Sequence, residues 1–347
     1  MAGAGRRRML LVVNPSATRV TTPALAAVVR SLRAGYDLDV ARTSGPGHAT
    51  ALARAAAVGG CDVVAALSGD GTANEVANGL AGSATALAPL PGGAGNVFVH
   101  LVGVPADLPL ATERLVAAAG PWAWRSVDLG RANGRHFVAG SGVGVSASVV
   151  RRVDARPRRK AAARQWYFAW TAALTFATRY LVAPPRMRVE AGDDVLDGIT
   201  AIVQNGHAFT FFGPRPIPVA LDAGLGTGTL GMAVLRAARP ADLVTLSARL
   251  LAGRPGVVAA HPRVAGLGPV RSARVSSLDG RPFPLEVDGD DLGDVDEVLY
   301  EVAPRALRVL QAAEPETYAA SRGPRRATRR RRRASRRSAR RTGRVRA

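Results

Sequence analysis

The first 120 residues alternate between short apolar runs and segments whose apolar side chains recur every three or four positions. The apolar runs at 9–13, 63–67 and 86–90 predict buried strands, because each is short and ends at a turn-forming residue. A further strand is expected at 37–42, and helices are expected at 23–32, 48–58, 73–80 and 106–119. This alternation predicts an α/β N-terminal domain with a doubly wound, mostly parallel sheet.

The pattern changes after about residue 126, where short β-prone runs are separated by turn signals. Asn133-Gly134, Asp279-Gly280 and Asp288-Gly289 are dipeptides typical of two-residue hairpins, and Gly192-Asp193-Asp194 marks another turn. Strands are expected at 135–140, 186–191, 200–204, 231–235, 274–277 and 285–287. The second domain is therefore expected to be a mainly antiparallel β-sandwich, interrupted by a helix near 166–181. The resulting division is 9–125, 126–297, a return to the first domain over 298–312, and a tail at 321–347.

The composition indicates how large a core the chain can form, and most of the net positive charge lies in one segment. With 347 residues and 47% hydrophobic content, the chain is large enough for two domains. Of the formal charge of +21, the segment 322–347 carries +14 as arginines without an acid, which leaves +7 elsewhere. This Arg-rich tail is expected to be disordered. Cys61 is the single cysteine, which excludes an internal disulfide.

Two apolar stretches are candidates for a membrane span or an export signal. The run at 9–13 is too short for a signal-peptide core, and the uncharged stretch 165–178 is shorter than the roughly 20 residues that a membrane span needs. The protein is therefore expected to be soluble or peripheral. The aromatic residues of 166–176 have helical spacing, which favours packing; the wall of an acyl-chain groove or a membrane-facing patch is the alternative.

A glycine-rich turn with one carboxylate follows the third expected strand. Glycines at 69 and 71 let backbone N–H groups and a helix N-terminus approach a phosphate, while Asp70 would repel a bare phosphate. Asp70 therefore indicates a cation or an attacking hydroxyl nearby, as phosphoryl transfer requires. Lys160 is the only lysine, so a GxxxxGK[ST] loop is excluded, and no third glycine completes GxGxxG. An isolated Gly-Asp-Gly is also compatible with a turn that needs glycine only for its geometry.

Other polar and glycine-rich segments also follow expected strands. Because the carboxyl ends of parallel strands meet at one edge of a sheet, segments at 14–16, 43, 68–72 and 91–96 are expected to converge on one crevice.

Read together, these segments make the chain resemble the diacylglycerol kinase catalytic family, the bacterial lipid kinases related to sphingosine and ceramide kinases. The motifs occur in family order over nearly all of residues 9–312. They are Val13-Asn14-Pro15-Ser16, Thr43 with Gly47-His48-Ala49, Ser68-Gly69-Asp70-Gly71-Thr72-Ala73-Asn74-Glu75-Val76, Pro91-Gly92-Gly93-Ala94-Gly95-Asn96-Val97-Phe98, Val127-Asp128-Leu129-Gly130 and Glu286-Val287-Asp288-Gly289-Asp290.

The resemblance implies ATP and Mg²⁺ as cofactors and assigns roles to residues. The catalytic residues would be Asp288, Asp290 and Asp70, with one acid of the late Asp-Gly-Asp accepting the proton of the lipid hydroxyl. Asp70 and Asp128 would lie near the metal and phosphates, while Mg²⁺ is expected to be held mainly through ATP. The implied nucleotide-binding residues are Asn14, Pro15, Ser16, Ala17, Thr18, Thr43, Ser68, Gly69, Asp70, Gly71, Thr72, Ala73, Asn74, Gly93 and Ala94.

Four positions depart from the family pattern. Asp290 replaces a glutamate, Ala94 replaces a Thr or Ser, Ser146 replaces the acid of a Phe-Asp-Ala element, and Thr227 falls in a replaced Asp-Gly-x-Leu-Asp element. The last element helps to bind a structural metal in the family, so no structural metal site is carried over. These departures keep open a diverged, inactive protein that binds nucleotide or lipid. An NAD-kinase-like or other small-molecule kinase is the other alternative, since such enzymes share the Gly-Asp-Gly turn.

The preferred function from the sequence is ATP-dependent phosphorylation of a lipid hydroxyl, most directly of diacylglycerol to phosphatidic acid. The segment 9–125 would then bind the nucleotide, and 126–297 would bind the lipid. The tail is expected to bind an anionic membrane surface, which places the protein in the cytoplasm at the inner face of the membrane. Non-specific nucleic-acid binding by the tail and a homodimer remain as further partner options.

Overall fold

The computed structural model describes residues 6–120, 123–155, 170–254 and 256–310. The tail at 321–347, residues 166–169 of the aromatic segment, Lys160 and the last two residues of the expected return segment lie outside the described residues.

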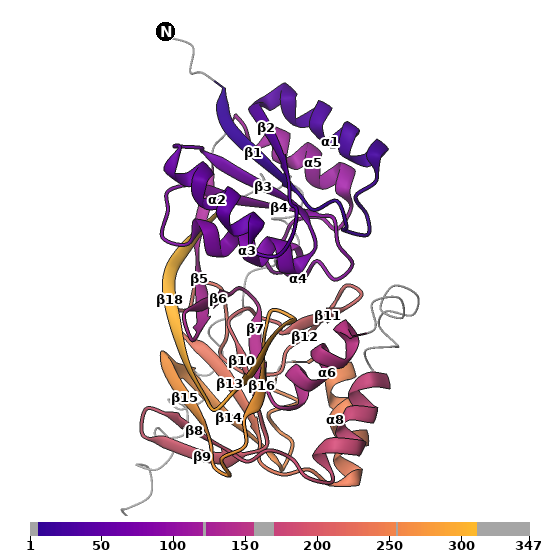
Figure 1. Ribbon diagram of the computed structural model, residues 1–347, viewed down its shortest axis with the longest axis vertical. Helices are drawn as coiled ribbons and strands as arrows, with labels where there is room; N and C mark the ends of the chain where they lie inside the picture. The colour runs from indigo at the N-terminus through magenta and orange to yellow at the C-terminus, as the bar shows by residue number, and fades with distance from the viewer. Residues whose placement is uncertain (1–5, 121–122, 156–169, 255, 311–347) are drawn as a thin grey trace, which may run out of the picture. The chain divides into compact units, whose positions relative to one another are not determined.

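The first half is an α/β domain, as the sequence predicted (Figure 1). Its strands pair in parallel in the order β2-β1-β3-β4. The strands are β1 (Arg7–Val13), β2 (Tyr36–Arg42), β3 (Val63–Ser68) and β4 (Ala86–Pro91). The helices are α1 (Thr22–Gly35), α2 (His48–Val58), α3 (Asp70–Leu80), α4 (Val97–Leu101) and α5 (Leu108–Ala117).

Each face of this sheet is covered by its own helices. Val28 and Leu32 of α1 and Leu115 of α5 pack on one face, against alternate residues of the strands. Val76 and Leu80 of α3 pack on the other face together with α2 and α4. Because both faces are buried, β3 and β4 are buried along their whole length, as a parallel sheet requires. The expected doubly wound arrangement is therefore confirmed.

Helix starts follow local signals. The hydroxyl of Thr21 accepts a hydrogen bond from the N–H of Ala24 at 3.3 Å, and Pro23 occupies the first turn of α1. Asp107 caps α5 in the same way through the N–H of Leu110, at 2.9 Å. These caps explain why the two helices begin within two residues of their predicted starts.

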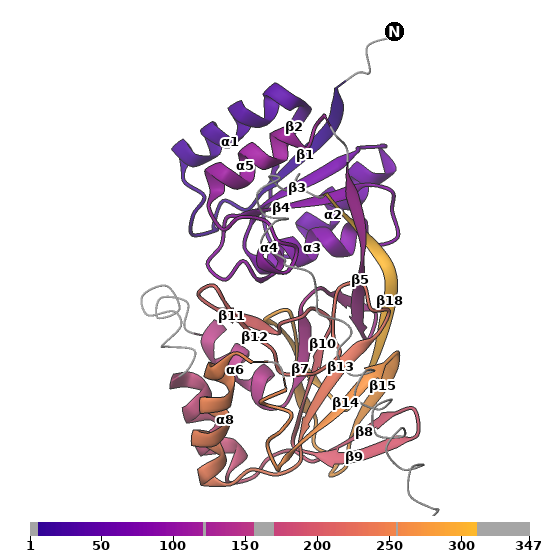
Figure 2. The same cartoon turned by 180° about the vertical axis from the view of Figure 1, so that it is seen from behind.

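The second half is an antiparallel β-sandwich, which confirms the predicted fold class (Figure 2). One layer has the strand order β14-β13-β10-β7-β16-β17, and the other contains β18, β15, β8 and β9. Met187, Val203, Val234, Phe283 and Tyr300 are among the side chains buried between them. The strands are β7 (Gly140–Val143), β8 (Met187–Ala191), β9 (Asp194–Gly198), β10 (Thr200–Gln204), β13 (Leu230–Leu235), β14 (Val264–Val270), β15 (Ser272–Ser277), β16 (Phe283–Val287), β17 (Asp290–Val295) and β18 (Glu297–Leu310).

Further elements complete this half. Helices α6 (Val145–Asp154) and α8 (Pro240–Ala252) were not predicted from the sequence. Residues 170–175 are α-helical and continue into the π-helix η1 (Phe176–Tyr180), within the helix expected near 166–181. A two-stranded ribbon is formed by β11 (Thr210–Phe212) and β12 (Arg215–Ile217).

The long strand β18 belongs to both halves. Its first residues pair with β15, while Arg308 and Val309 pair in parallel with Ala86 and Leu87 of β4. It also pairs along its length with β5 (Trp124–Ala132), which forms a hairpin with β6 (Arg135–Phe137). One strand thus ties the sandwich to the parallel sheet of the first half, and Figure 1 shows it running between them.

Two of the three Asn/Asp-Gly dipeptides form the expected hairpins. Asn133-Gly134 joins β5 to β6, and Asp288-Gly289 joins β16 to β17, with positive φ at both residues of each pair. The expectation for Asp279-Gly280 is wrong, because β15 and β16 lie in different layers and do not pair. There the Asp279 carboxylate accepts the N–H of Arg281 at 3.2 Å and stabilises a crossover turn instead.

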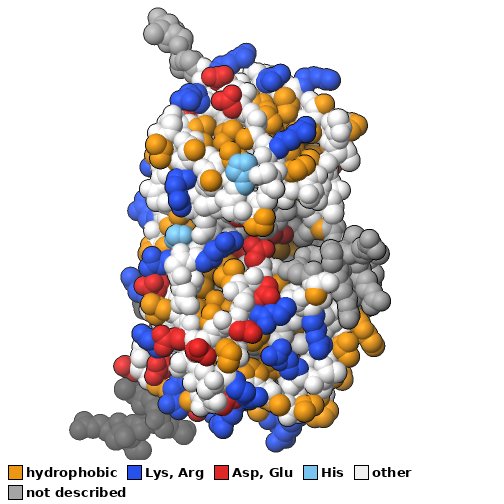
Figure 3. Space-filling model, viewed as in Figure 1, with side chains coloured by type: hydrophobic (Ala, Val, Ile, Leu, Met, Phe, Trp, Pro, Cys, Tyr) orange, Lys and Arg blue, Asp and Glu red, His pale blue; other side chains and the backbone are white. Residues whose placement is uncertain are grey.

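Among the described residues, none of the helices has the length and apolarity needed to cross a membrane. Arginines and acids are interspersed over the face shown in Figure 3.

Candidate active site

The strand ends that the sequence placed in one crevice lie in register. Val13 pairs with Arg42 and with Leu67, and Ser68 pairs with Pro91. The segments that follow these four strands therefore leave the sheet at the same edge, where ligands bind in open α/β sheets.

The Gly69-Asp70-Gly71 turn packs directly on the turn after β4. A Cβ atom at Gly93 would collide with the Cα of Gly69, and one at Gly92 would lie 2.7 Å from the nitrogen of Ser68. Glycine is required here because two backbone segments pass without room for a side chain. The two turns form one continuous backbone surface at the N-terminus of α3, which is the surface that a phosphate chain needs.

Asp70 is the carboxylate at the start of α3. Its Oδ1 accepts the N–H of Phe98 at 3.2 Å, and its Oδ2 would lie 2.8 Å from a Cβ at Gly95. Burial raises the pKa of Asp70 to about 6; the Asp288 charge adds to this rise, and backbone N–H groups of the α4 segment oppose it. Asp70 is therefore a carboxylate whose ionisation falls close to neutral pH.

The first strand end is anchored to the same helix. Asn14 donates from Nδ2 to the hydroxyl of Thr72 at 2.8 Å, and its Oδ1 accepts the N–H of Ser16 at 2.9 Å. The N–H of Thr43 donates to the carbonyl of Val13 at 2.9 Å, which places Thr43 beside this turn. Asn14, Ser16, Thr43 and Thr72 are thus brought together as the sequence expected.

Glu75 has a different place from its neighbours in the motif. Its carboxylate accepts the N–H groups of Gly47 at 2.9 Å and Ala49 at 3.1 Å. These are N–H groups at the beginning of α2, so Glu75 holds the two helices together. This role was not predicted.

The late acidic turn is a two-residue hairpin whose first acid is fully engaged. Asp288 accepts the N–H groups of Val138 at 2.7 Å, Ala139 at 2.8 Å and Gly140 at 3.1 Å, and the Nδ2 of Asn74 at 2.8 Å. Burial raises the pKa of Asp288, while these donors oppose the rise.

Asn74 joins the two acidic turns. It is 2% exposed and lies one turn into α3, where its Nδ2 donates both to Asp288 and to the carbonyl of His136 at 2.9 Å. Asn78, one turn further, accepts the N–H of His136 at 2.9 Å. Two asparagines spaced four apart thus clamp the β5–β6 hairpin to the helix that carries Asp70.

Asp290 faces the first turn of α3. Its Oδ1 would lie 3.0 Å from a Cβ at Gly71, and its Oδ2 lies 3.4 Å from a guanidinium nitrogen of Arg135. The Asp290 side chain is 42% exposed. The Asp290 carboxylate is thus partly exposed, whereas the Asp288 carboxylate is occupied by four N–H donors.

Asp128 is engaged by backbone groups from two other segments. Its Oδ1 accepts the N–H of Arg305 at 2.8 Å and its Oδ2 accepts the N–H of Gly228 at 2.6 Å. The hydroxyl of Thr227 closes the same loop by donating to the carbonyl of Gly224 at 3.0 Å. Asp128 thus links β5, β18 and the 224–229 loop, and its expected place near a metal stays a prediction.

Two residues of the site were not predicted, Arg135 and Glu286. Arg135 donates to the Oδ1 of Asn74 at 2.9 Å, and it reaches the site because the Asn133-Gly134 turn folds β6 back. Glu286 is 1% exposed behind the hairpin, and burial raises its pKa to about 8. The hairpin dipeptide was a signal for Arg135, but no sequence pattern distinguished Glu286 from the rest of its motif.

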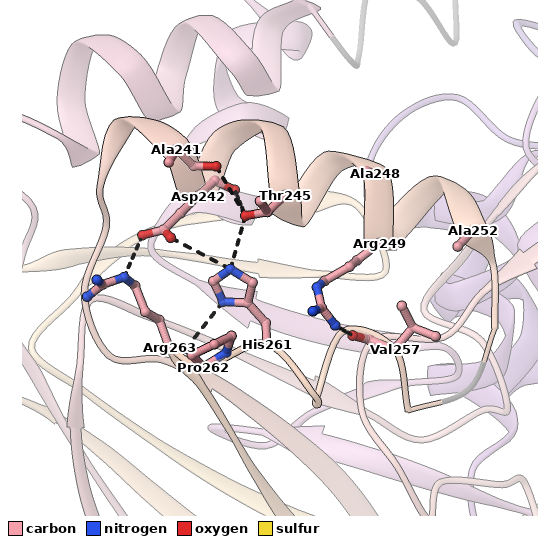
Figure 4. Close-up of a pocket in the computed structure, with 10 residues that line it drawn as sticks. All are labelled: Ala241, Asp242, Thr245, Ala248, Arg249, Ala252, Val257, His261, Pro262 and Arg263. Carbon is pink, nitrogen blue, oxygen red and sulfur yellow. Dashed lines mark hydrogen bonds and ion pairs between the residues drawn. The ribbon is translucent and has the colours of Figure 1, made fainter.

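A separate hollow of about 760 Å³ lies between α8 and the 257–263 segment (Figure 4). Its polar side chains bind one another: Asp242 pairs with Arg263 at 2.9 Å, and His261 Nε2 lies 3.1 Å from the Thr245 hydroxyl. Arg249 donates to the carbonyl of Val257 at 2.6 Å. These contacts dock α8 onto the sandwich, and none involves the acidic turns.

Two family models match the chain. The model described as diacylglycerol kinase catalytic domain matches residues 8–132, and the model described as YegS C-terminal NAD kinase beta sandwich-like domain matches residues 140–311. The two models together cover both halves of the fold, and their matches confirm the resemblance to the diacylglycerol kinase catalytic family that the motifs indicated.

Individual relatives agree with this assignment. A diacylglycerol kinase of Bacillus subtilis (strain 168) is 33% identical over 143 residues, which are 40% of this chain and 46% of that protein. The chain thus spans about half the length of this curated relative. A diacylglycerol kinase of Staphylococcus epidermidis (strain ATCC 35984) is 25% identical over 82% of this chain and 86% of its own length.

A solved structure shares the fold. The crystal structure of a diacylglycerol kinase from Bacillus anthracis str. Sterne superposes with a TM-score of 0.69 at 21% identity, covering 90% of this chain and 98% of that chain.

Proposed function

We propose that the protein is an ATP-dependent kinase that transfers the γ-phosphate to the hydroxyl of a lipid, with diacylglycerol as the first acceptor to test. One contact supports this most directly, the 2.8 Å hydrogen bond from Asn74 to Asp288. It joins α3, which begins at the glycine turn proposed to bind phosphate, to the hairpin that carries Asp290, the candidate base. Phosphoryl transfer needs those two elements side by side.

Asp290 is the proposed general base. A lipid hydroxyl is a weak nucleophile, and the exposed carboxylate of Asp290 can take its proton as the new oxygen–phosphorus bond forms. The bond from the γ-phosphorus to the bridging oxygen breaks, and ADP leaves with the electron pair. Asp288 has four N–H donors around it and is proposed to position the hairpin rather than to accept the proton.

The proposed nucleotide site fits the triphosphate of ATP. The back-to-back turns at 69–71 and 92–94 present backbone N–H groups, and the polar side chains of Asn14, Ser16, Thr43 and Thr72 border them. Ala94 contributes no hydroxyl, so backbone groups carry the contact there. The segment 9–125 is proposed as the nucleotide-binding part and 126–297 as the lipid-binding part.

The acids present fit Mg²⁺ that arrives with the nucleotide. Among the described residues, no group of three or more His, Cys, Asp or Glu side chains could hold a metal ion by itself. Mg²⁺ commonly takes one or two carboxylates together with substrate phosphates, and Asp70 is the carboxylate at the phosphate turn. When bound, Mg²⁺ would neutralise charge on the phosphates.

Purified protein incubated with labelled ATP, Mg²⁺ and a panel of acceptors tests the proposal. We expect label in phosphatidic acid when diacylglycerol is supplied, and roughly a hundredfold slower labelling with the Asp290→Ala variant. The Asp294→Ala variant is the matched control, because Asp294 lies on the same strand with similar exposure but pairs with Arg151. Label only in NAD would move the function to a small-molecule kinase. No transfer to any acceptor would favour a diverged binding protein.

The tail is proposed as an attachment to anionic membrane. Its 14 arginines without an acid would bind an anionic surface where the lipid substrate resides. Non-specific nucleic-acid binding is the competing outcome for the same charge.

A further inference from the structure

A buried acid and a buried hydroxyl lie behind the catalytic hairpin, and the proposed function does not use them. Glu286 is on β16, and Ser146 is in the first turn of α6. The Oε2 of Glu286 accepts the N–H of Gly289 at 3.0 Å. Its Oε1 and the Ser146 hydroxyl are both buried without a hydrogen-bond partner in the described part of the chain. Buried polar atoms without partners are rare and call for an explanation.

The two oxygens converge on one point in the fold. A Cβ atom at Gly142 would collide with the Ser146 hydroxyl and would lie 2.9 Å from the Oε1 of Glu286. Gly142 belongs to β7 and pairs with Glu286 of β16, the neighbouring strand in the same layer. A side chain at position 142 would therefore fill the space that the acid and the hydroxyl share.

We propose that Glu286 and Ser146 form a positioning pair for catalysis, in which the acid of β16 faces α6 and fixes the Asp288-Gly289-Asp290 turn through the N–H of Gly289. The inference rests on the proposed function and deepens it. Position 146 is also where the family pattern has an aspartate, so the acid that α6 lacks here is supplied from the strand that faces it.

The position of Gly289 controls the orientation of both acids in this turn. Asp288 and Gly289 have φ values of 48° and 84°, and a two-residue turn of this kind orients both flanking side chains at once. A shift at Gly289 would move Asp288 among its donors and Asp290 over Gly71. Displacement of reacting groups by about 1 Å can cost up to about a hundredfold in rate.

The charge state of Glu286 gives the pair a measurable signature. The groups that face it are Asp288, Asp290, Ser146 and Tyr300; Arg151 of α6 instead pairs with Asp291 and Asp294. Burial raises the pKa of Glu286 to about 8, the two aspartate charges add to this, and the N–H of Gly289 opposes it. Glu286 is therefore mostly neutral at pH 7, and its ionisation above pH 8 adds a charge beside Asp288 and Asp290.

Kinetics of three variants test the positioning role. Glu286→Gln keeps a neutral acceptor for Gly289, so we expect kcat within about threefold of the native value at pH 7. We also expect kcat of the native protein, but not of this variant, to decline above about pH 8. Glu286→Leu removes the acceptor, so kcat should fall about tenfold with little change in the KM for ATP. Adding Ser146→Asp to Glu286→Leu should recover most of that loss. Glu190→Gln, at an exposed position of β8, is the control.

Thermal melting provides a readout that does not depend on activity. Because folding raises the pKa of Glu286 above its ordinary value of 4.5, the neutral acid contributes stability that is fully present below pH 4.5 and is lost as pH rises through about 8. The native protein should therefore lose more melting temperature than Glu286→Gln between pH 6 and pH 9.

The outcomes separate the inference from the function. Unchanged kcat in Glu286→Leu, or no recovery with Ser146→Asp, would overturn the positioning pair and leave the kinase proposal intact. If the native protein phosphorylates no lipid, the proposed function fails, and the inference fails with it as a statement about catalysis. If the native protein and Glu286→Gln lose the same melting temperature between pH 6 and pH 9, the inference that Glu286 is a neutral buried acid is wrong.

Discussion

The two acidic turns of the site are built by different means. Gly69-Asp70-Gly71 joins β3 to the helix that follows it, and the backbone N–H groups that contact Asp70 belong to residues 96–98, just after the next strand. Asp288-Gly289-Asp290 is a hairpin of the sandwich, yet Asp288 takes its donors from residues 138–140 and from Asn74, which is 214 positions away. The first turn is thus a local product of the α/β pattern, whereas the second depends on the contact between the two halves.

This difference also sets the electrostatics of the two acids. Burial raises the pKa of Asp70 to about 6, and backbone N–H groups of residues 96–98 oppose the rise. Asp288 is surrounded by N–H groups that oppose the effect of burial. The pair of turns therefore provides one carboxylate whose pKa is raised to about 6 and a second that four N–H donors hold in place.

Removing the charge of the local turn should have the largest effect. Asp70→Asn keeps the shape and the acceptor for Phe98 but loses the carboxylate at the phosphates, so we expect turnover to be abolished with the fold intact. Steady-state phosphorylation and circular dichroism would measure this. Asp62→Asn, at the other end of β3, is the control and should remain active. Native-like kinetics in Asp70→Asn would remove the main support for the site.

Changing the base of the hairpin should have the next largest effect. Asp290→Ala should lower kcat by roughly a hundredfold, the scale of a lost general base. Asp290→Glu restores the usual family residue but extends toward Gly71, so we expect an intermediate rate. If Asp290→Ala were as active as native while Asp288→Ala was inactive, the roles of the two acids would have to be exchanged.

Breaking the link between the turns should have a moderate effect. Asn74→Ala removes a hydrogen bond to a carboxylate, and we expect about tenfold lower kcat because the hairpin loses its register with α3. Asn78→Ala is the matched control, since it also loses a contact to His136 but has none to Asp288. Equal losses in both variants would mean that the clamp on β6, and not the bond to Asp288, matters.

Truncation of the tail should leave both turns untouched and affect activity least. Removing the residues after Gly323 should weaken sedimentation with anionic vesicles, since each arginine near such a surface contributes about 1 kcal/mol. Activity on detergent-dispersed lipid should change little. Full sedimentation of the truncated protein at moderate salt would shift the attachment to the helix that carries Trp170, whose side chain is 68% exposed.

The two Asp-Gly dipeptides show how much of the structure a local sequence can predict. Asp288-Gly289 and Asp279-Gly280 look alike in the sequence, but only the first is a hairpin. The dipeptide fixes a backbone that accepts positive φ, while the pairing of the flanking strands decides whether a hairpin forms. Helices α6 and α8 were missed because the β-prone runs around them dominated the pattern.

The sequence by itself determined the alternating strands and helices, the glycine turn after β3 and the family, because these depend on periodicity and on short motifs. Only the tertiary structure decided which acid is exposed, which acid is cradled and which buried acid lies behind the hairpin. The bond from Asn74 to Asp288 and the burial of Glu286 join residues remote in the chain or hidden between layers. Such contacts depend on how two sheets pack, and that packing is not encoded in any short stretch of residues.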